Sequence, residues 1–318
     1  MLSKIRFAAF AAAAVSVATL AAPARADGFV NVLTGGTSGV YYPLGVALTQ
    51  IYGAGIPGVK TQVQATKASV ENLNLLQQGR GEIAFALGDS VRDAWEGNTE
   101  VGFKAKLDKL RGIAAIYPNY IQIVALKSSG VTKFTDLKGK SLSVGAPKSG
   151  TELNARAIFG AHGMKYADLG KTEYLPFAES VDLMKNRQLD ATLQSAGLGV
   201  ASIRDLSTSV ETTIVAVDAE TVKKIGAPYV PVTIPAGTYQ GQSEPVPTAA
   251  VVNFLVTHAG VPDETVYQMT KLTFENLDKL VAAHGAAKNI KLETALDGMP
   301  VPLHPGAARY FKEKGLLK

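Results

Sequence analysis

The chain has 318 residues, a formal net charge of +5 at pH 7 and no cysteine. The missing cysteines exclude a disulfide framework, a thiol nucleophile and thiolate metal sites. The length is typical of two domains.

Residues 1–26 have the pattern of a cleaved signal peptide. Lys4 and Arg6 form a positive start, residues 7–20 are an apolar run, and residues 24–26 (ARA) form a small-residue cleavage site. The alternative is a transmembrane anchor, but the run is shorter than the roughly 20 residues that a spanning helix needs. We therefore expect export to the periplasm and removal of this segment.

Cleavage would change the charge of the protein. Residues 1–26 contain Lys4, Arg6 and Arg25 but no acidic residue, so their loss lowers the net charge from +5 to +2. No cluster of basic residues appears elsewhere, and we expect no nucleic-acid partner.

Strand-like and helix-like segments alternate along the rest of the chain, as in the βαβ units of a parallel sheet. The pattern changes where two short strands, 113–116 and 121–126, flank Tyr117-Pro-Asn-Tyr120, and then restarts. Other strands are expected at 30–33, 59–65, 83–87, 141–144, 173–175, 189–193 and 249–257. Helices are expected at 43–52, 69–76, 153–162, 262–274, 277–283 and 307–314, and others should start near Asp89 and Ser180.

Two loops rich in Gly, Ser and Thr each follow a strand and precede a helix: residues 35–45 (GGTSGVYYPLG) and 143–152 (SVGAPKSGTE). Free backbone N–H groups and the positive end of the helix dipole can hold an anion there. Their hydroxyl groups suit a carboxylate, which accepts several hydrogen bonds at once. Alternatively, the glycines only make turns and the hydroxyls only cap helices. Two such loops indicate a ligand clamped between two lobes.

Sequence motifs of catalysis are missing. A nucleophile elbow needs glycine two residues after the serine, but Val40 follows Ser38 at that position. Thr151 follows Gly150 where a phosphate-binding P-loop would have lysine. The four histidines are scattered without metal-ligand spacing. We expect no enzyme, no metal and no cofactor; a secreted hydrolase, which would need a base near Ser38 or Ser149, is a remote alternative.

The loop at 35–45 resembles the signature of the TAXI family of TRAP-transporter solute receptors. The resemblance continues through residues 65–72 (ATKASVEN), 136–140 (DLKGK), 145–152 (GAPKSGTE) and 304–311 (HPGAARYF), and covers nearly the whole mature chain.

The resemblance implies a two-lobed α/β fold of the periplasmic-binding-protein type II class. Each lobe would be a mostly parallel sheet flanked by helices, with the ligand in the cleft between the lobes. Lobe I would comprise residues 27–119 plus 226–318, and lobe II residues 120–225, with hinge crossings near 117–122 and 219–226. Such a receptor delivers its solute to a TRAP membrane permease, and family members bind glutamate, glutamine or C4/C5 dicarboxylates such as 2-oxoglutarate. A receptor of an ABC transporter or of a sensor, with the same fold, is the alternative.

The resemblance also implies the residues that bind the ligand. They lie in the first loop, after it, at the crossing and in the second loop: Gly36, Thr37, Ser38, Tyr41, Ser69, Asn72, Tyr117, Gln122, Lys148, Ser149, Gly150 and Thr151. Lys148 either supplies a cation for a second carboxylate or points to solvent. An amine-bearing ligand would need a facing carboxylate, for which Asp89, Glu71 or Glu152 could serve, whereas a keto acid needs none.

Overall fold

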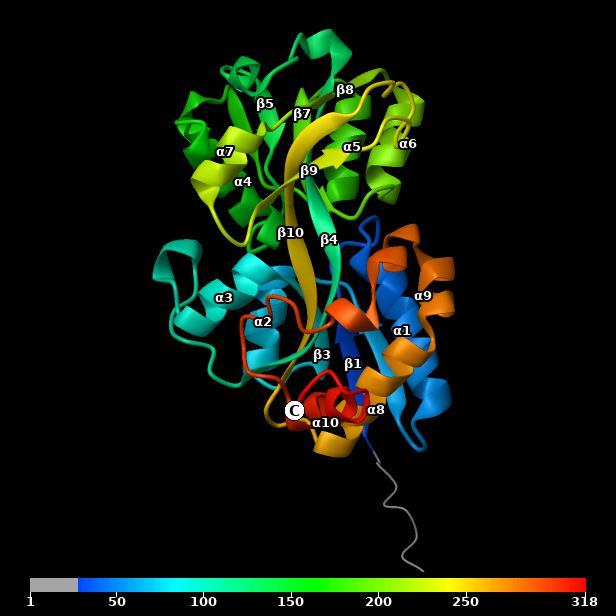
Figure 1. The fold of residues 1–318 in the computed structure, drawn as a ribbon. Helices are drawn as coiled ribbons and strands as arrows, with labels where there is room; N and C mark the ends of the chain where they lie inside the picture. The colour runs from blue at the N-terminus through cyan, green and yellow to red at the C-terminus, as the bar shows by residue number, and fades with distance from the viewer. Residues whose placement is uncertain (1–27) are drawn as a thin grey trace, which may run out of the picture.

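The computed structural model describes residues 28–318, so the expected signal peptide and its cleavage site lie outside the described residues. The chain forms two lobes, one above the other in Figure 1, joined by two long strands. No helix within residues 28–318 is both long and apolar enough to cross a membrane.

The lower lobe of Figure 1, lobe 1, is built on the sheet order β2-β1-β3-β10. Its parallel strands are β1 (Phe29–Leu33), β2 (Lys60–Gln64) and β3 (Ile83–Leu87), and the antiparallel strand is β10 (Val246–His258). Its helices are α1 (Tyr41–Gly55), α2 (Ser69–Gln77), α3 (Gly88–Glu96), α8 (Asp263–Glu275), α9 (Leu277–Ala283) and α10 (Pro305–Glu313). Every residue of β3 is buried, as expected for a central strand covered on both faces.

The upper lobe, lobe 2, continues the same sheet with the order β4-β7-β5-β6. Its strands are β4 (Leu110–Leu126), β5 (Ser141–Ser143), β6 (Lys171–Glu173), β7 (Ala191–Ala196), β8 (Thr212–Val215) and β9 (Val230–Ile234). Its helices are α4 (Gly150–Ala161), α5 (Phe177–Lys185), α6 (Ala201–Ser209) and α7 (Ala219–Ile225). Leu142, Ile158 and Leu193 belong to a core that packs inside this lobe.

The first crossing between the lobes is one 17-residue strand, β4, where the sequence predicted two short strands. Pro118 has no N–H to donate, and we predicted an interruption there. In the structure it lies opposite Val252 of β10, next to a register shift between Val252 and Phe254. Irregular pairing of this kind is where a sheet tolerates proline. The strand therefore runs through the expected hinge segment.

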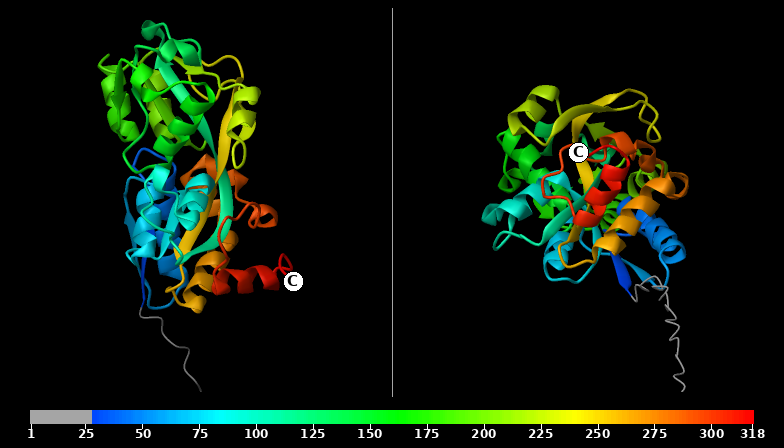
Figure 2. Two further views of the ribbon diagram at one scale, coloured as in Figure 1. Left: turned by 90° about the vertical axis from the view of Figure 1, so that its left-hand side faces the viewer. Right: turned by 60° about the horizontal axis from the view of Figure 1, so that its bottom comes forward.

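The second crossing is β10, not the expected segment 219–226. Helix α7 packs against α4 and β9, all in lobe 2. Strand β9 pairs with the first residues of β10, from Val246 to Ala250, and Ala250 lies opposite Tyr120 of β4. Figure 2 shows both long strands running from one lobe to the other. We therefore place both crossings in the paired middle parts of β4 and β10.

A candidate anion-binding cleft between the lobes

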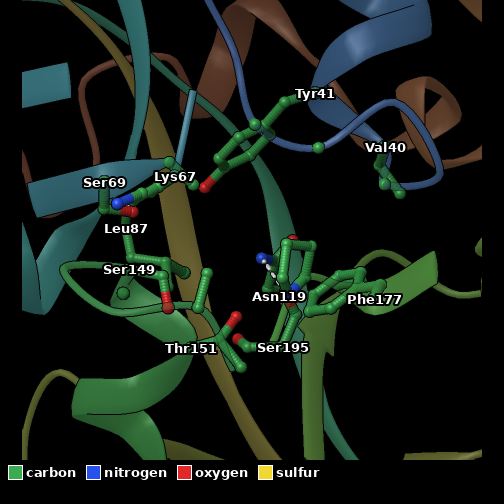
Figure 3. A pocket seen from close by; sticks show the side chains of 18 of the residues that line it. Val40, Tyr41, Lys67, Ser69, Leu87, Asn119, Ser149, Thr151, Phe177 and Ser195 are labelled. Atoms are coloured by element: carbon green, nitrogen blue, oxygen red, sulfur yellow. Dashed lines mark hydrogen bonds between the residues drawn. The ribbon is translucent and has the colours of Figure 1, made fainter. Parts of the chain in front are cut away.

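A pocket with an empty volume of about 690 Å³ lies where the two lobes meet. Residues from both lobes line it (Figure 3). Tyr41 and Ser69 approach from lobe 1, whereas Thr151 and Ser195 approach from lobe 2. Apolar side chains such as Phe177 form part of the wall.

Four helices begin at this pocket, two from each lobe. The first residues of α1, α2, α4 and α5, which are Tyr41, Ser69, Gly150 and Phe177, all line it. The starts of α1, α2 and α5 have no side-chain cap. In α2, however, the Glu71 N–H already donates to the Lys148 carbonyl. A helix start carries partial positive charge and free N–H donors. The pocket is therefore suited to a negatively charged ligand.

A hydrogen-bond network supports the pocket floor at the level of the crossing strands. The Tyr41 hydroxyl donates to Asn253 Oδ1. The Asn253 amide donates to Asn119 Oδ1 at 2.8 Å, and the Asn119 amide donates to the Ser195 carbonyl, also at 2.8 Å. The network joins α1, β10, β4 and β7, and thus both lobes. Burial raises the pKa of Tyr41 well above its ordinary value, so this hydroxyl stays a neutral donor.

Six of the twelve predicted site residues line the pocket: Gly36, Tyr41, Ser69, Ser149, Gly150 and Thr151. The Ser149 hydroxyl also accepts the Glu152 N–H at 3.1 Å and so caps α4, as the alternative interpretation predicted. The Ser69 hydroxyl likewise accepts the Leu87 N–H at 3.1 Å. Each hydroxyl keeps its proton for donation to a ligand.

The other predicted residues are not in the pocket lining: Thr37, Ser38, Asn72, Tyr117, Gln122 and Lys148. Asn72 is fully buried, and its amide donates to the carbonyls of Thr34 and Phe85 at 2.7 and 2.9 Å. This amide joins Thr34, the residue after β1, to the middle of β3. Its role is therefore to position the loops rather than to face the cleft.

Gln122 and Lys148 are also engaged elsewhere or turned away. The Gln122 amide donates to the Ala196 carbonyl at 3.0 Å, and its oxygen accepts from Tyr239. Lys148 is exposed and has φ of 61°, and its carbonyl accepts the Glu71 N–H across the lobes at 3.2 Å. Its backbone, rather than its ammonium group, makes this contact between the lobes.

The sequence reasoning missed Lys67, Asn119 and Ser195, which line the pocket. Lys67 lies in the segment 65–72 that carried the family resemblance. Asn119 lies in the crossing segment 117–120, and Ser195 lies at the carboxyl end of β7, where open α/β sheets bind ligands. The sequence therefore contained an indication for each of these three residues. The Ser195 hydroxyl is buried and has no hydrogen-bond partner within residues 28–318.

A second contact between the lobes lies beside the pocket. The Asp89 carboxylate of lobe 1 accepts hydrogen bonds from the Tyr229 hydroxyl and the Asn154 amide of lobe 2, both at 2.6 Å. It also accepts the Ser90 N–H at 2.7 Å. Burial raises the pKa of Asp89, although the Tyr229 hydrogen bond opposes that shift. The lobes are thus in contact on this side of the cleft.

Comparison with known proteins agrees with this architecture. The periplasmic binding protein BugD matches with a TM-score of 0.57 at 13% identity, covering 92% of this chain and 99% of that one. The alkanesulfonate-binding protein SsuA from Xanthomonas axonopodis pv. citri, bound to MOPS, matches with a TM-score of 0.52 at 14% identity, covering 91% and 94%. A putative L-cystine ABC transporter from Listeria monocytogenes matches with a TM-score of 0.52 at 14% identity, covering 83% and 98%.

At these identities the solved structures show a shared fold, and they confirm the predicted two-lobed periplasmic-binding-protein fold of type II character. A family model adds a relationship in sequence, because it matches residues 32–315, nearly the whole chain. The chain belongs to the NMT1-like family.

Proposed function

We propose that this protein is a periplasmic solute receptor that captures a small carboxylate between its lobes and delivers it to a membrane permease. The observation that carries the proposal is the convergence of four helix starts, two from each lobe, on one pocket. Such helix starts stabilise anions. The described residues that line the pocket include no histidine and no acidic residue that could act as a base, which supports binding rather than hydrolysis.

Closure of the lobes would be the event that the ligand controls. An anion touched by both lobes binds the closed arrangement more tightly than the open one, and that difference drives the equilibrium toward closure. The paired middle parts of β4 and β10 are where the backbone would absorb the rotation. A closed, loaded receptor is the form that a permease can distinguish from an empty one.

The class of permease has two candidates. The resemblance of the two loops to the TAXI family favours a TRAP permease. The fold shared with a putative L-cystine ABC transporter favours an ABC permease. The receptor can be reconstituted with a TRAP permease and, separately, with an ABC permease. The permease that takes up the bound solute identifies the class.

Binding can be measured by calorimetry with glutamate, glutamine, 2-oxoglutarate and succinate. Replacing Ser149 or Thr151 by Ala should weaken binding by about 1–3 kcal/mol, the scale of a hydrogen bond to a charged group. Thr208→Ala, at an exposed position of α6 in the same lobe, is the matched control and should leave affinity unchanged. If none of the four compounds binds, the carboxylate proposal is wrong.

Small-angle scattering tests closure with the same compounds. The ligand that binds should make the protein more compact and raise its melting temperature, because it binds only the native state. A raised melting temperature with an unchanged scattering profile would instead indicate a site within one lobe. For export, N-terminal sequencing of the periplasmic form should find a start at or near Asp27.

A further inference from the structure

We propose that the pocket selects organic anions without an ammonium group, such as 2-oxo acids and dicarboxylic acids, over the corresponding α-amino acids. The inference rests on the proposed function as a receptor for small carboxylates. It concerns which member of that class the site accepts.

The charge of the pocket lining is the first argument. Of the described residues that line the pocket, Lys67 is the one that carries a charge, and that charge is positive. The four helix starts add partial positive charge from both lobes. A buried ammonium group needs a negative partner, since an unpaired buried charge is strongly unfavourable. The lining therefore offers a positively charged partner to a carboxylate, but it offers no negatively charged partner to an ammonium group.

The acidic residues closest in sequence to the pocket are engaged elsewhere. The Glu71 carboxylate accepts the Lys67 N–H at 2.6 Å. The Glu152 carboxylate lies 2.7 Å from Arg156 Nε in an ion pair and accepts the Tyr166 hydroxyl at 3.1 Å. Neither residue lines the pocket. Both had been candidates for holding an amine, and their partners leave them unsuited to it.

Asp89, the third candidate, faces the neighbouring contact between the lobes. One carboxylate oxygen accepts from Tyr229 and Asn154, and the other accepts the Ser90 N–H. Asp89 is buried and does not line the pocket. An ammonium group in the pocket would have to draw this carboxylate away from the donors that join the lobes.

The neutral groups of the pocket also favour an acceptor-only ligand. The Ser69 and Ser149 hydroxyls each accept one backbone N–H, and each keeps its proton for donation to a carboxylate or keto oxygen of the ligand. The unpartnered Ser195 hydroxyl can donate to a carboxylate or a keto oxygen. Carboxylate and keto oxygens accept hydrogen bonds, whereas an ammonium group only donates them.

The test compares three compounds of one carbon skeleton by calorimetry: 2-oxoglutarate, glutarate and L-glutamate. We expect 2-oxoglutarate and glutarate to bind at least about tenfold more tightly than L-glutamate, since the mismatched ligand leaves a buried charge unpaired. L-glutamate that binds as tightly as 2-oxoglutarate overturns the inference and leaves the receptor function intact. Binding of none of the three overturns the carboxylate function, and the inference with it.

Lys67→Gln tests the source of the selectivity. Lys67 is exposed at the pocket rim, so its replacement should leave the melting temperature of the unligated protein unchanged. We expect about tenfold weaker binding of 2-oxoglutarate and a smaller difference from L-glutamate, because a charge-assisted contact is lost. Lys60→Gln, at an exposed position of β2, is the matched control and should change neither quantity. An unchanged 2-oxoglutarate affinity in Lys67→Gln would show that this charge takes no part in the selection.

Discussion

One methyl group added at Gly150 should oppose closure of the lobes without lowering the stability of the protein. A Cβ placed on Gly150, at the start of α4 in lobe 2, would lie 2.7 Å from Leu87 Cδ1 and 2.7 Å from Ser69 Oγ, both in lobe 1. Leu87 and Ser69 are both buried, and Ser69 Cβ, which no side-chain rotation can move, would lie 3.0 Å from the added Cβ. Overpacking of this kind costs about 1–3 kcal/mol. The clash exists only while the lobes are in contact, so Gly150→Ala should oppose closure.

The expected result is a loss of affinity without a loss of stability. If the ligand binds the closed arrangement, Gly150→Ala should weaken 2-oxoglutarate binding by about 5- to 150-fold, the factor that corresponds to 1–3 kcal/mol. Calorimetry measures this, and the melting temperature of the unligated protein should not fall. Gly160→Ala, in the same helix but with no atom within 4 Å of the added Cβ, is the control and should bind normally. Unchanged affinity in Gly150→Ala, with compaction like that of the wild type, would refute the idea that the bound state has these contacts.

Three further changes test the cleft and its surroundings. Ser195→Ala should weaken 2-oxoglutarate binding by about 0.5–1.5 kcal/mol without lowering the free energy of unfolding in urea, because the hydroxyl has no partner among the described residues. Burial raises the pKa of Asp89 above 3.8, so its contribution to stability is full below that value and is lost as pH rises through the raised pKa. Asp89→Asn should therefore gain melting temperature relative to the wild type as pH rises, and a difference independent of pH would contradict this assignment. Ala68 has φ of 70° and ψ of −145°, a backbone conformation that favours glycine. Ala68→Gly should therefore raise the free energy of unfolding, measured in urea, by about 1 kcal/mol. A decrease would show that the backbone is not strained at this position.

Local features of the sequence determined most elements of each lobe, although α6, β8 and α7 were not predicted. The alternation of strands and helices and the glycine-rich loops predicted parallel strands followed by helices, and α1 and α4 indeed start within the two loops. Ser149 was expected at a helix start and caps α4. These features depend on residues close together in the chain, where periodicity and capping act.

Tertiary packing decided which side chains meet at the cleft. Asn72 and Gln122 lie in segments that approach the site, but their amides donate hydrogen bonds to buried backbone carbonyl groups. The sequence alone does not show which carbonyl groups need such a donor. Asn119 and Ser195 are 76 residues apart, and only the pairing of β4 with β7 brings them together. The second crossing depends in the same way on which strand pairs with β4. Local sequence determined the segments because their structure is local, whereas pairing and burial between distant segments determined the cleft and the hinge.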